Sequence, residues 1–357
     1  MPLTAKATSL AAVLDDLTAE GAAELTEHLP DHSLRCFACG HRCLIKDGKR
    51  GICKVRFNEG GSLRVPANYV AALQCDPTEK KPFFHALPGS DTLTFGMLGC
   101  DLHCAYCQNW LTSQALRDDA AVSPPNVVSA DRLVTMAKAY GASLVGSSYN
   151  EPLITAEWAV EVFKKARPEG FRTAFISNGN ATPQVLDYLR PWTDCYKIDL
   201  KSMNDRNYRQ LGGVVDNILD TVKMVHERGF WEEIVTLVIP GFNDSEAELK
   251  RAADFIAEVS PDIPWHVTAF HQDYKMTSNA NTTAEQLIRA CEIGRAAGLR
   301  YVYAGNLPGR VGRWENTFCP SCDGLLVERY GYLIRQMKVT PAGQCPSCSE
   351  NIPGIWS

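Results

Sequence analysis

The sequence contains no long apolar run, and no stretch approaches the 18 or more apolar residues of a membrane-spanning helix. It also lacks a basic excess, because 41 Asp and Glu outnumber 36 Lys and Arg, for a net charge of −5 at pH 7. A basic footprint for nucleic acid is therefore absent. The N-terminus lacks the layout of a signal peptide, since its short apolar stretch 10–14 ends at Asp15 and Asp16. We expect a cytoplasmic protein that binds neither membrane nor nucleic acid.

Cysteine, in contrast, is abundant, with 14 residues in a chain of 357. In a reducing compartment such cysteines favour metal ligation or redox chemistry over a disulfide framework. Most of them fall into three groups that are well separated along the chain. The groups are Cys36, Cys39, Cys43 and Cys53; Cys100, Cys104 and Cys107; and Cys319, Cys322, Cys345 and Cys348.

From about residue 90, short apolar segments alternate with helical patterns, which predicts βα units around a parallel sheet. The expected strands cover residues 92–98, 144–149, 173–177, 195–200, 234–239, 265–270 and 300–304. The expected helices cover residues 130–140, 155–166, 182–189, 218–228, 246–259 and 284–297. Six units and a closing strand indicate an α/β fold of the partial (β/α)6 barrel type, whose chemistry lies at the carboxyl ends of the strands.

The pattern divides the chain into four parts. Residues 1–35 form an N-terminal helical segment, with a helix expected over 7–28, and residues 36–89 form a four-cysteine metal module. Residues 90–310 form the partial barrel, and residues 311–357 form a cysteine-bearing C-terminal module.

The middle group has the spacing C-x3-C-x2-C, on the loop after the first expected barrel strand. Three thiolates can hold a cubane iron–sulfur cluster and leave one iron open, whereas electron-transfer clusters use four. An open iron can chelate the amine and carboxylate of S-adenosylmethionine (SAM). An electron passed into the sulfonium then yields a 5'-deoxyadenosyl radical, which abstracts hydrogen. The alternative is a structural zinc site completed by His103 or by a distant ligand.

This motif resembles the signature of the radical SAM superfamily, including the aromatic Tyr106, which in the family lies against the adenine. The match is close to pyruvate formate-lyase-activating enzymes. Residues 148–152 stand where activases have Gly-Gly-Glu, and the resemblance implies that Glu151 accepts a hydrogen bond from the SAM amine. Residues 176–179 resemble the ribose-side Thr-Asn-Gly, which assigns Ser177 and Asn178 to SAM binding.

The resemblance continues along the barrel. Asp199 and Lys201 resemble the Asp-x-Lys of activases, whose lysine pairs with the SAM carboxylate. Val238 belongs to a segment like the adenine-side strand end, which works through main-chain groups, and His271 matches a residue that reaches the ribose. One departure is Ile176, which replaces an aspartate and argues against a monovalent cation site like that of the activases.

The flanks look like the radical SAM component of the AmmeMemoRadiSam system (AmrS-type). The matching segments are residues 36–43, 51–56, 76–82, 107–110 and 148–152, and the resemblance covers about the whole chain after residue 34. It implies an activating-enzyme-like oxidoreductase, with AMMECR-type and Memo-type proteins as companions. The electron donor would be a protein such as flavodoxin or ferredoxin. The substrate does not follow from it.

The two remaining cysteine groups have four members each. Cys319 with Cys322 and Cys345 with Cys348 are C-P-x-C knuckles around an expected hairpin, which predicts a zinc ribbon with a structural or docking role. The N-terminal group, Cys36 to Cys53, suits either structural zinc or a second iron–sulfur cluster, since thiolates accept both metals.

Three functions remain open from the sequence: an AmrS-type radical SAM enzyme on an unidentified substrate, a glycyl radical enzyme activase, and a non-enzymatic metal module that docks partners. The run Glu79-Lys80-Lys81 fits either a functional site or a solvated charge cluster. His266, on the sixth expected strand, fits either the substrate cavity or a satisfied core histidine.

Overall fold

The computed structural model describes residues 9–357, and its largest sheet has eight strands in the order β16-β15-β14-β13-β12-β11-β9-β8. Neighbours from β9 to β16 run parallel, and β8 pairs antiparallel with β9 at one edge. The strands are β8 Ala72–Pro77, β9 Asp91–Gly96, β11 Leu144–Ser147, β12 Arg172–Ser177, β13 Cys195–Asp199, β14 Trp231–Val238, β15 Trp265–Ala269 and β16 Val302–Gly305. Because β8 and β16 lie at opposite edges, the sheet is open, which is compatible with a partial barrel.

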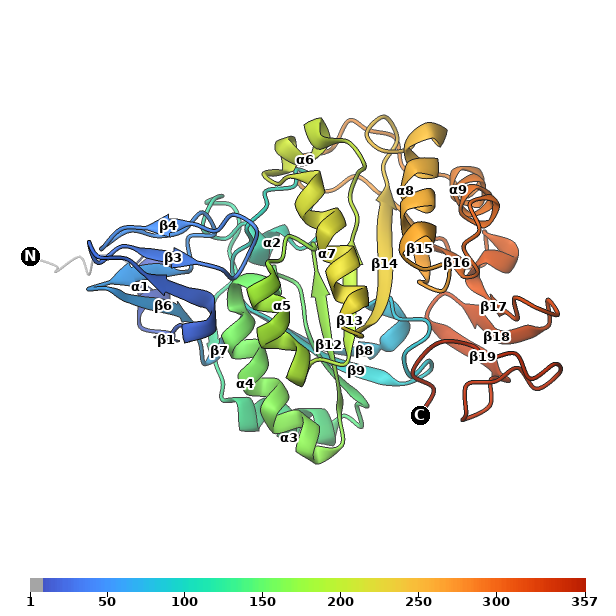
Figure 1. Cartoon of the computed structure of the whole chain (residues 1–357), viewed down its shortest axis with the longest axis horizontal. Helices are drawn as coiled ribbons and strands as arrows, with labels where there is room; N and C mark the ends of the chain where they lie inside the picture. The colour runs from blue at the N-terminus through green and yellow to red at the C-terminus, as the bar shows by residue number, and fades with distance from the viewer. Residues whose placement is uncertain (1–8) are drawn as a thin grey trace, which may run out of the picture.

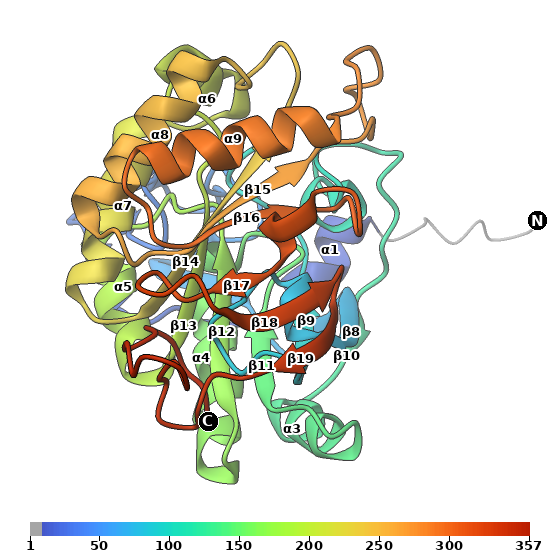
Figure 2. The same cartoon turned by 90° about the vertical axis from the view of Figure 1, so that its right-hand side faces the viewer.

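Helices cover the outer face of this sheet (Figures 1 and 2). They are α3 Ala130–Ala139, α4 Ala156–Ala166, α5 Pro183–Leu189, α6 Asp205–Leu211, α7 Val215–Glu227, α8 Glu246–Val259 and α9 Ala284–Ala296. Ser129, Thr182, Ser245 and Thr283 begin four of them, each accepting a backbone N–H three residues later, as N-caps do. Across residues 9–357, none of the helices combines the length and apolar character needed to cross a bilayer.

The alternation expected from residue 90 onward is confirmed. Each of the seven expected strands and six expected helices is present, with ends that differ by up to three residues. The sequence patterns missed the short helices α2 Trp110–Ser113 and α6, and the two-residue strand β10 Asn126–Val127, which pairs with β7 Tyr69–Val70. These elements are too short to show a periodicity.

The N-terminal region differs from expectation. The helix expected over 7–28 is limited to α1, Leu10–Asp15, while residues 7 and 8 lie outside the described part of the chain. Two short strands, β1 and β2, follow α1, and each pairs with a later strand instead of forming turns of a helix. The six strands of the N-terminal region are β1 Thr18–Glu20, β2 Thr26–His28, β3 Leu34–Cys36, β4 Leu44–Ile45, β5 Phe57–Glu59 and β6 Ser62–Pro66.

Local chemistry explains this difference. Thr18 and Thr26 are β-branched and favour strands, and the Gly21 N–H donates to the Leu63 carbonyl in the neighbouring chain segment. Since β1 pairs with β6 and β2 with β3, the residues before 36 belong to one folded unit with the module that follows, and not to a separate helical segment.

The C-terminal module is a three-stranded antiparallel sheet packed against the end of the large sheet (Figure 2). Its strands are β17 Thr317–Phe318, β18 Leu325–Tyr330 and β19 Leu333–Met337. Phe84, Tyr303, Leu326 and Val327 form a shared buried cluster. Arg329, only 4% exposed, donates to the Phe84 carbonyl at 2.9 Å, so the module is fixed to the sheet by a buried polar contact as well as by apolar packing.

Candidate functional site

A cavity of about 390 Å³ lies beside the carboxyl ends of the parallel strands. All three cysteines of the middle group line it, on the loop after β9. Glu151 follows β11 and Asn178 follows β12, and both line the same cavity. The volume is in the range of small-molecule sites. The structure therefore brings the three-cysteine loop together with the polar residues that the sequence placed at strand ends.

Glu151 is a buried carboxylate with three hydrogen-bond donors. Its Oε1 accepts from Ser177 Oγ at 2.7 Å and from the Leu153 N–H at 3.0 Å, and its Oε2 accepts from the Asn178 N–H at 2.7 Å. Burial, reinforced by the nearby Asp101 carboxylate, raises the pKa of Glu151 to about 8. A cation bound beside Glu151 would stabilise its ionised form.

A second buried carboxylate, Asp101, was missed by the sequence analysis. It is fully buried and accepts from Asn178 Nδ2 at 2.7 Å and from Asn180 Nδ2 at 2.8 Å. Gly179 lies between these two asparagines with φ +77°, and a Cβ there would approach the Ile198 side chain to 2.7 Å. Glycine at 179 therefore allows both amides to reach Asp101, which ties the strand end of β12 to the cysteine loop.

Three charged side chains of β13 and its end form one cluster in the cavity. Lys197 Nζ and Lys201 Nζ both donate to Asp199, the latter at 3.2 Å. Burial disfavours ionised Asp199, but the two lysines outweigh it and lower the pKa to about 2. Two ammonium groups around one carboxylate leave a net positive charge, which suits an anionic ligand group. Lys197 was also missed, because within a strand it reads as an outward-facing residue.

Of the other residues expected to bind SAM, Tyr106 lines the cavity, whereas Val238 and His271 do not. Tyr106 is buried, lines the cavity and makes an edge contact with Phe242 at 5.8 Å between ring centroids. Val238 is fully buried behind the lining, and its carbonyl accepts from Thr282 Oγ1. His271 is exposed, and its Nε2 lies 3.0 Å from Gln108 Nε2, next to Cys107.

Other side chains that line the cavity are not among the residues expected to bind SAM, and we call this part of the lining the far half. Lys81 Nζ donates to Asp76 Oδ2 at 2.9 Å and to the Tyr149 hydroxyl at 3.0 Å. Lys81 is nearly buried and Glu79 fully so, which shows that this part of the sequence is not a solvated charge run. Tyr332, from the turn between β18 and β19, also lines the cavity.

His266 both lines this far half and has a buried partner. Its Nε2 lies 2.6 Å from Glu233 Oε2. Burial opposes ionisation of Glu233, but hydrogen bonding and charge interaction with His266 lower the pKa of this carboxyl group. His266 is therefore a satisfied histidine that still faces the cavity, so both interpretations of the sequence hold.

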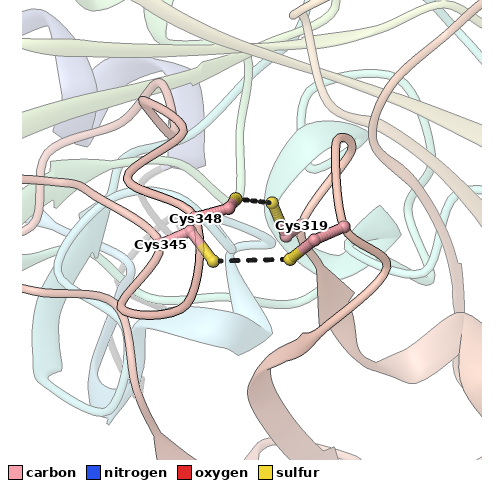
Figure 3. A group of neighbouring side chains, drawn as sticks. Cys319, Cys345 and Cys348 are labelled. Atoms are coloured by element: carbon pink, nitrogen blue, oxygen red, sulfur yellow. Dashed lines mark hydrogen bonds between the residues drawn. The ribbon is translucent and has the colours of Figure 1, made fainter.

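The C-terminal cysteines converge as a tetrahedral site requires (Figure 3). The four Sγ atoms all lie within 4.8 Å of one another, with 3.5 Å between Cys319 and Cys348 and 3.7 Å between Cys322 and Cys345. Tetrahedral zinc with Zn–S bonds of about 2.3 Å needs sulfurs about 3.8 Å apart. The arrangement therefore fits a zinc ion. Of the N-terminal cysteines, Cys36, Cys39 and Cys53 are buried and Cys43 is partly exposed.

Comparisons with known proteins extend these observations. The signature of the radical SAM superfamily matches residues 95–256, which contain the cysteine loop, Glu151 and Lys201. The uncharacterized protein MJ0808 of Methanocaldococcus jannaschii is 33% identical over 329 residues, which cover 91% of this chain and 97% of that protein. The chain belongs to the radical SAM superfamily. It is also similar to pyruvate formate-lyase 1-activating enzyme of Escherichia coli, at 26% identity over 199 residues, 52% of this chain and 78% of the enzyme.

Among solved structures, the chain is similar to a domain of pyruvate-formate lyase-activating enzyme from Bacteroides vulgatus. The match is 23% identical, has a TM-score of 0.41, and covers 45% of this chain and 98% of that domain. Radical SAM proteins are generally enzymes, and cleavage of SAM at a four-iron cluster is typical of them. The residues of this chain fit both SAM and a four-iron cluster, because three cysteines, one buried carboxylate and a cationic cluster line one cavity.

Proposed function

We propose that this chain reductively cleaves SAM at a four-iron cluster held by Cys100, Cys104 and Cys107 and abstracts hydrogen from a substrate in the same cavity. The supporting observation is that these three cysteines share the cavity with Glu151 and Lys201. The cluster, when bound and reduced, supplies the electron that breaks a carbon–sulfur bond of SAM and gives a 5'-deoxyadenosyl radical.

The residues of this chain position SAM by pairing with its ammonium and its carboxylate. Glu151 accepts a hydrogen bond from the SAM ammonium, which also compensates its buried charge. The net positive charge around Asp199 attracts the SAM carboxylate, with Lys201 as its direct partner. Tyr106 lies against the adenine, while Ser177 and Asn178 hold the ribose side. Val238 and His271 complete the adenine and ribose sides, and they adjoin the cavity through the lining residues Leu237 and Gln108.

We further infer that the substrate binds in the far half of the cavity. Lys81, Tyr149, His266 and Tyr332 all line the cavity, and none of them is among the residues expected to bind SAM. Three of these four lie outside residues 95–256. Lys81 precedes β9, His266 lies on β15, and Tyr332 belongs to the C-terminal module. Substrate choice would then depend on the flanking modules, and the chemistry on the barrel.

The flanking motifs support assignment to the AmrS-type component of the AmmeMemoRadiSam system. On this assignment AMMECR-type and Memo-type proteins are partners, a flavodoxin or ferredoxin supplies electrons, and the C-terminal module holds zinc. Size-exclusion chromatography of the purified proteins, alone and mixed, tests the partnership. Separate elution of all three in the presence of SAM would contradict it.

The catalytic proposal is tested on anaerobically reconstituted protein with dithionite and SAM. Release of 5'-deoxyadenosine, measured by chromatography, is expected from the wild type even without substrate, and is expected to be lost when all three cysteines of the middle group are replaced by alanine. A lone cysteine outside the three groups, Cys75, provides the matched control, and Cys75→Ser should release normal amounts. Equal release from the triple variant would refute the site.

Similarity to activating enzymes favours a second candidate, an activase that makes a glycyl radical on a partner protein. Ile176 in place of the activases' aspartate and the two flanking cysteine modules argue against it. A glycyl radical enzyme encoded beside this chain, which gains a glycyl radical signal in electron paramagnetic resonance (EPR) when mixed with it and SAM, would establish the activase.

A further inference from the structure

The N-terminal cysteines converge on one region of the first module. Cys36 ends β3, and its N–H donates to the Cys43 carbonyl at 3.0 Å. The Ile52 N–H points to Cys43 Sγ at 3.5 Å, which brings the loop that carries Cys53 to the same place. Cys43 also packs against the buried cluster that contains Cys36 and Ala38. The four residues can therefore surround one metal group.

The spacing of these sulfurs differs from that of the C-terminal site. Among the His, Cys, Asp and Glu residues of 9–357, only the C-terminal four form a group of three or more with all ligand atoms within 4.8 Å. The N-terminal four are more widely spaced, and so are the three cysteines of the middle group. One zinc ion requires sulfurs about 3.8 Å apart. In a four-iron cluster each thiolate binds a different iron, which separates the sulfurs further.

The N-terminal cysteines also lie directly against the middle cysteine loop. Gly99 precedes Cys100 with φ +95°, and a Cβ at residue 99 would be 3.3 Å from the Cys53 carbonyl oxygen and 2.9 Å from Val55. His41, between Cys39 and Cys43 in the sequence, places Nε2 3.2 Å from the Asp101 carbonyl oxygen. The segments that carry the two cysteine groups are therefore in direct contact.

Arg117 connects the same two segments. Its guanidinium donates to the Cys100 carbonyl at 2.7 Å and to the Ile52 carbonyl at 2.8 Å. On its other side the N-terminal group approaches the surface, because Ile52, next to Cys53, is 47% exposed. The N-terminal group thus lies between the surface at Ile52 and the loop that carries the middle cysteines.

We propose that Cys36, Cys39, Cys43 and Cys53 hold a second four-iron cluster that relays electrons to the SAM-binding cluster. A one-electron donor of the flavodoxin or ferredoxin class reduces the second cluster. That cluster is reoxidised when it passes the electron to the cluster at Cys100, Cys104 and Cys107. The latter returns to its oxidised state when SAM is cleaved, so one electron enters and one leaves per SAM. The relay rests on the proposed function, but the metal assignment does not.

The metal assignment is tested in the variant that lacks all three cysteines of the middle group, because it leaves the N-terminal group intact. After anaerobic reconstitution this variant should keep about four irons per chain, with a reduced-cluster EPR signal, and about one zinc in the C-terminal site. About two zincs per chain with no iron would overturn the proposal. The wild type should hold about eight irons, and Cys75→Ser should match it.

The relay is tested with Cys39→Ser/Cys53→Ser. This variant should keep about four irons at the middle group. It should still release 5'-deoxyadenosine with dithionite, which reduces the SAM-binding cluster directly, but release with reduced flavodoxin should be lost. Undiminished release with flavodoxin would overturn the relay. Absence of 5'-deoxyadenosine from the wild type with dithionite would instead refute the proposed function, while the iron count of the triple variant still decides the second cluster.

Discussion

Glu151 offers the sharpest test of how this chain binds SAM. Its carboxylate is 3% exposed and lines the cavity, and three protein donors already hold it in place. Glu151→Gln removes the charge with little change in volume. A hydrogen bond to a charged group contributes about 1.5–3 kcal/mol. Because each 1.4 kcal/mol is a factor of ten, the dissociation constant of SAM should rise about 10- to 150-fold.

The assay is equilibrium dialysis of radiolabelled SAM against anaerobically reconstituted protein, with the iron content measured in parallel. The iron content should not change, because Glu151 is not a cysteine ligand. Glu315 provides a matched control: it is a buried carboxylate that accepts the N–H groups of Gly309 and Gly331, and it does not line the cavity. Glu315→Gln should bind SAM like the wild type, even if its melting temperature falls.

The raised pKa of Glu151 adds a dependence on pH. Its pKa of about 8 means that the side chain is mostly protonated at lower pH, while pairing with the SAM ammonium requires the carboxylate. SAM affinity of the wild type should therefore increase as the pH rises toward 8, by up to about tenfold per pH unit. Glu151→Gln should lack this slope. Equal affinity of both proteins, with no difference in slope, would refute the proposed role.

Three further predictions follow from the metal sites and the buried contacts. Cys322→Ser should lower the zinc content by about one ion per chain and lower the melting temperature, because a structural zinc site contributes folding free energy; unchanged zinc would contradict the zinc ribbon. Arg329→Met should lower the free energy of unfolding by about 3–5 kcal/mol, because it leaves the buried Glu79 carboxylate without a cation. The double variant Glu79→Gln/Arg329→Met should lose less than the sum of the single losses in chemical denaturation, by about 0.5–3 kcal/mol, and additive losses would exclude coupling.

Much of the barrel was predictable because its signals are local. The spacing of buried residues in α4, such as Trp158, Val162 and Phe163, follows the helical period, and Ser129 and Thr283 mark helix starts by their capping chemistry. The prediction of a helix over residues 7–28 was wrong because it relied on the same kind of local signal. Leucines at roughly helical spacing before residue 28 favoured a helix, whereas pairing with strand residues 6 to 48 positions away decides the structure there.

The parts of the site that sequence analysis missed depend on distant partners. The sequence left open whether Glu79 and Lys81 are functional or solvated. The burial of Glu79 is explained only by Arg329, 250 positions later, which lies beside its carboxylate. Lys197 looks like an ordinary strand residue, and only Asp199 at the strand end explains its burial. Asp101 had one local signal, its position directly after Cys100. Charged residues that are buried must be paired, but the pairing partner cannot be identified from spacing alone.

The origin of the residues that line the cavity indicates which relatives share this chain's substrate. The superfamily signature matches residues 95–256, and the match to the Escherichia coli activating enzyme spans 52% of this chain. The match to MJ0808 covers 91% of the chain and must therefore extend into both flanking modules. Since Lys81 and Tyr332 enter the far half of the cavity from those modules, we expect the SAM chemistry to be common to all three proteins and the substrate to be shared only with MJ0808. A substrate found for either of these two proteins should therefore stimulate 5'-deoxyadenosine release by the other, and failure in both directions would separate their functions.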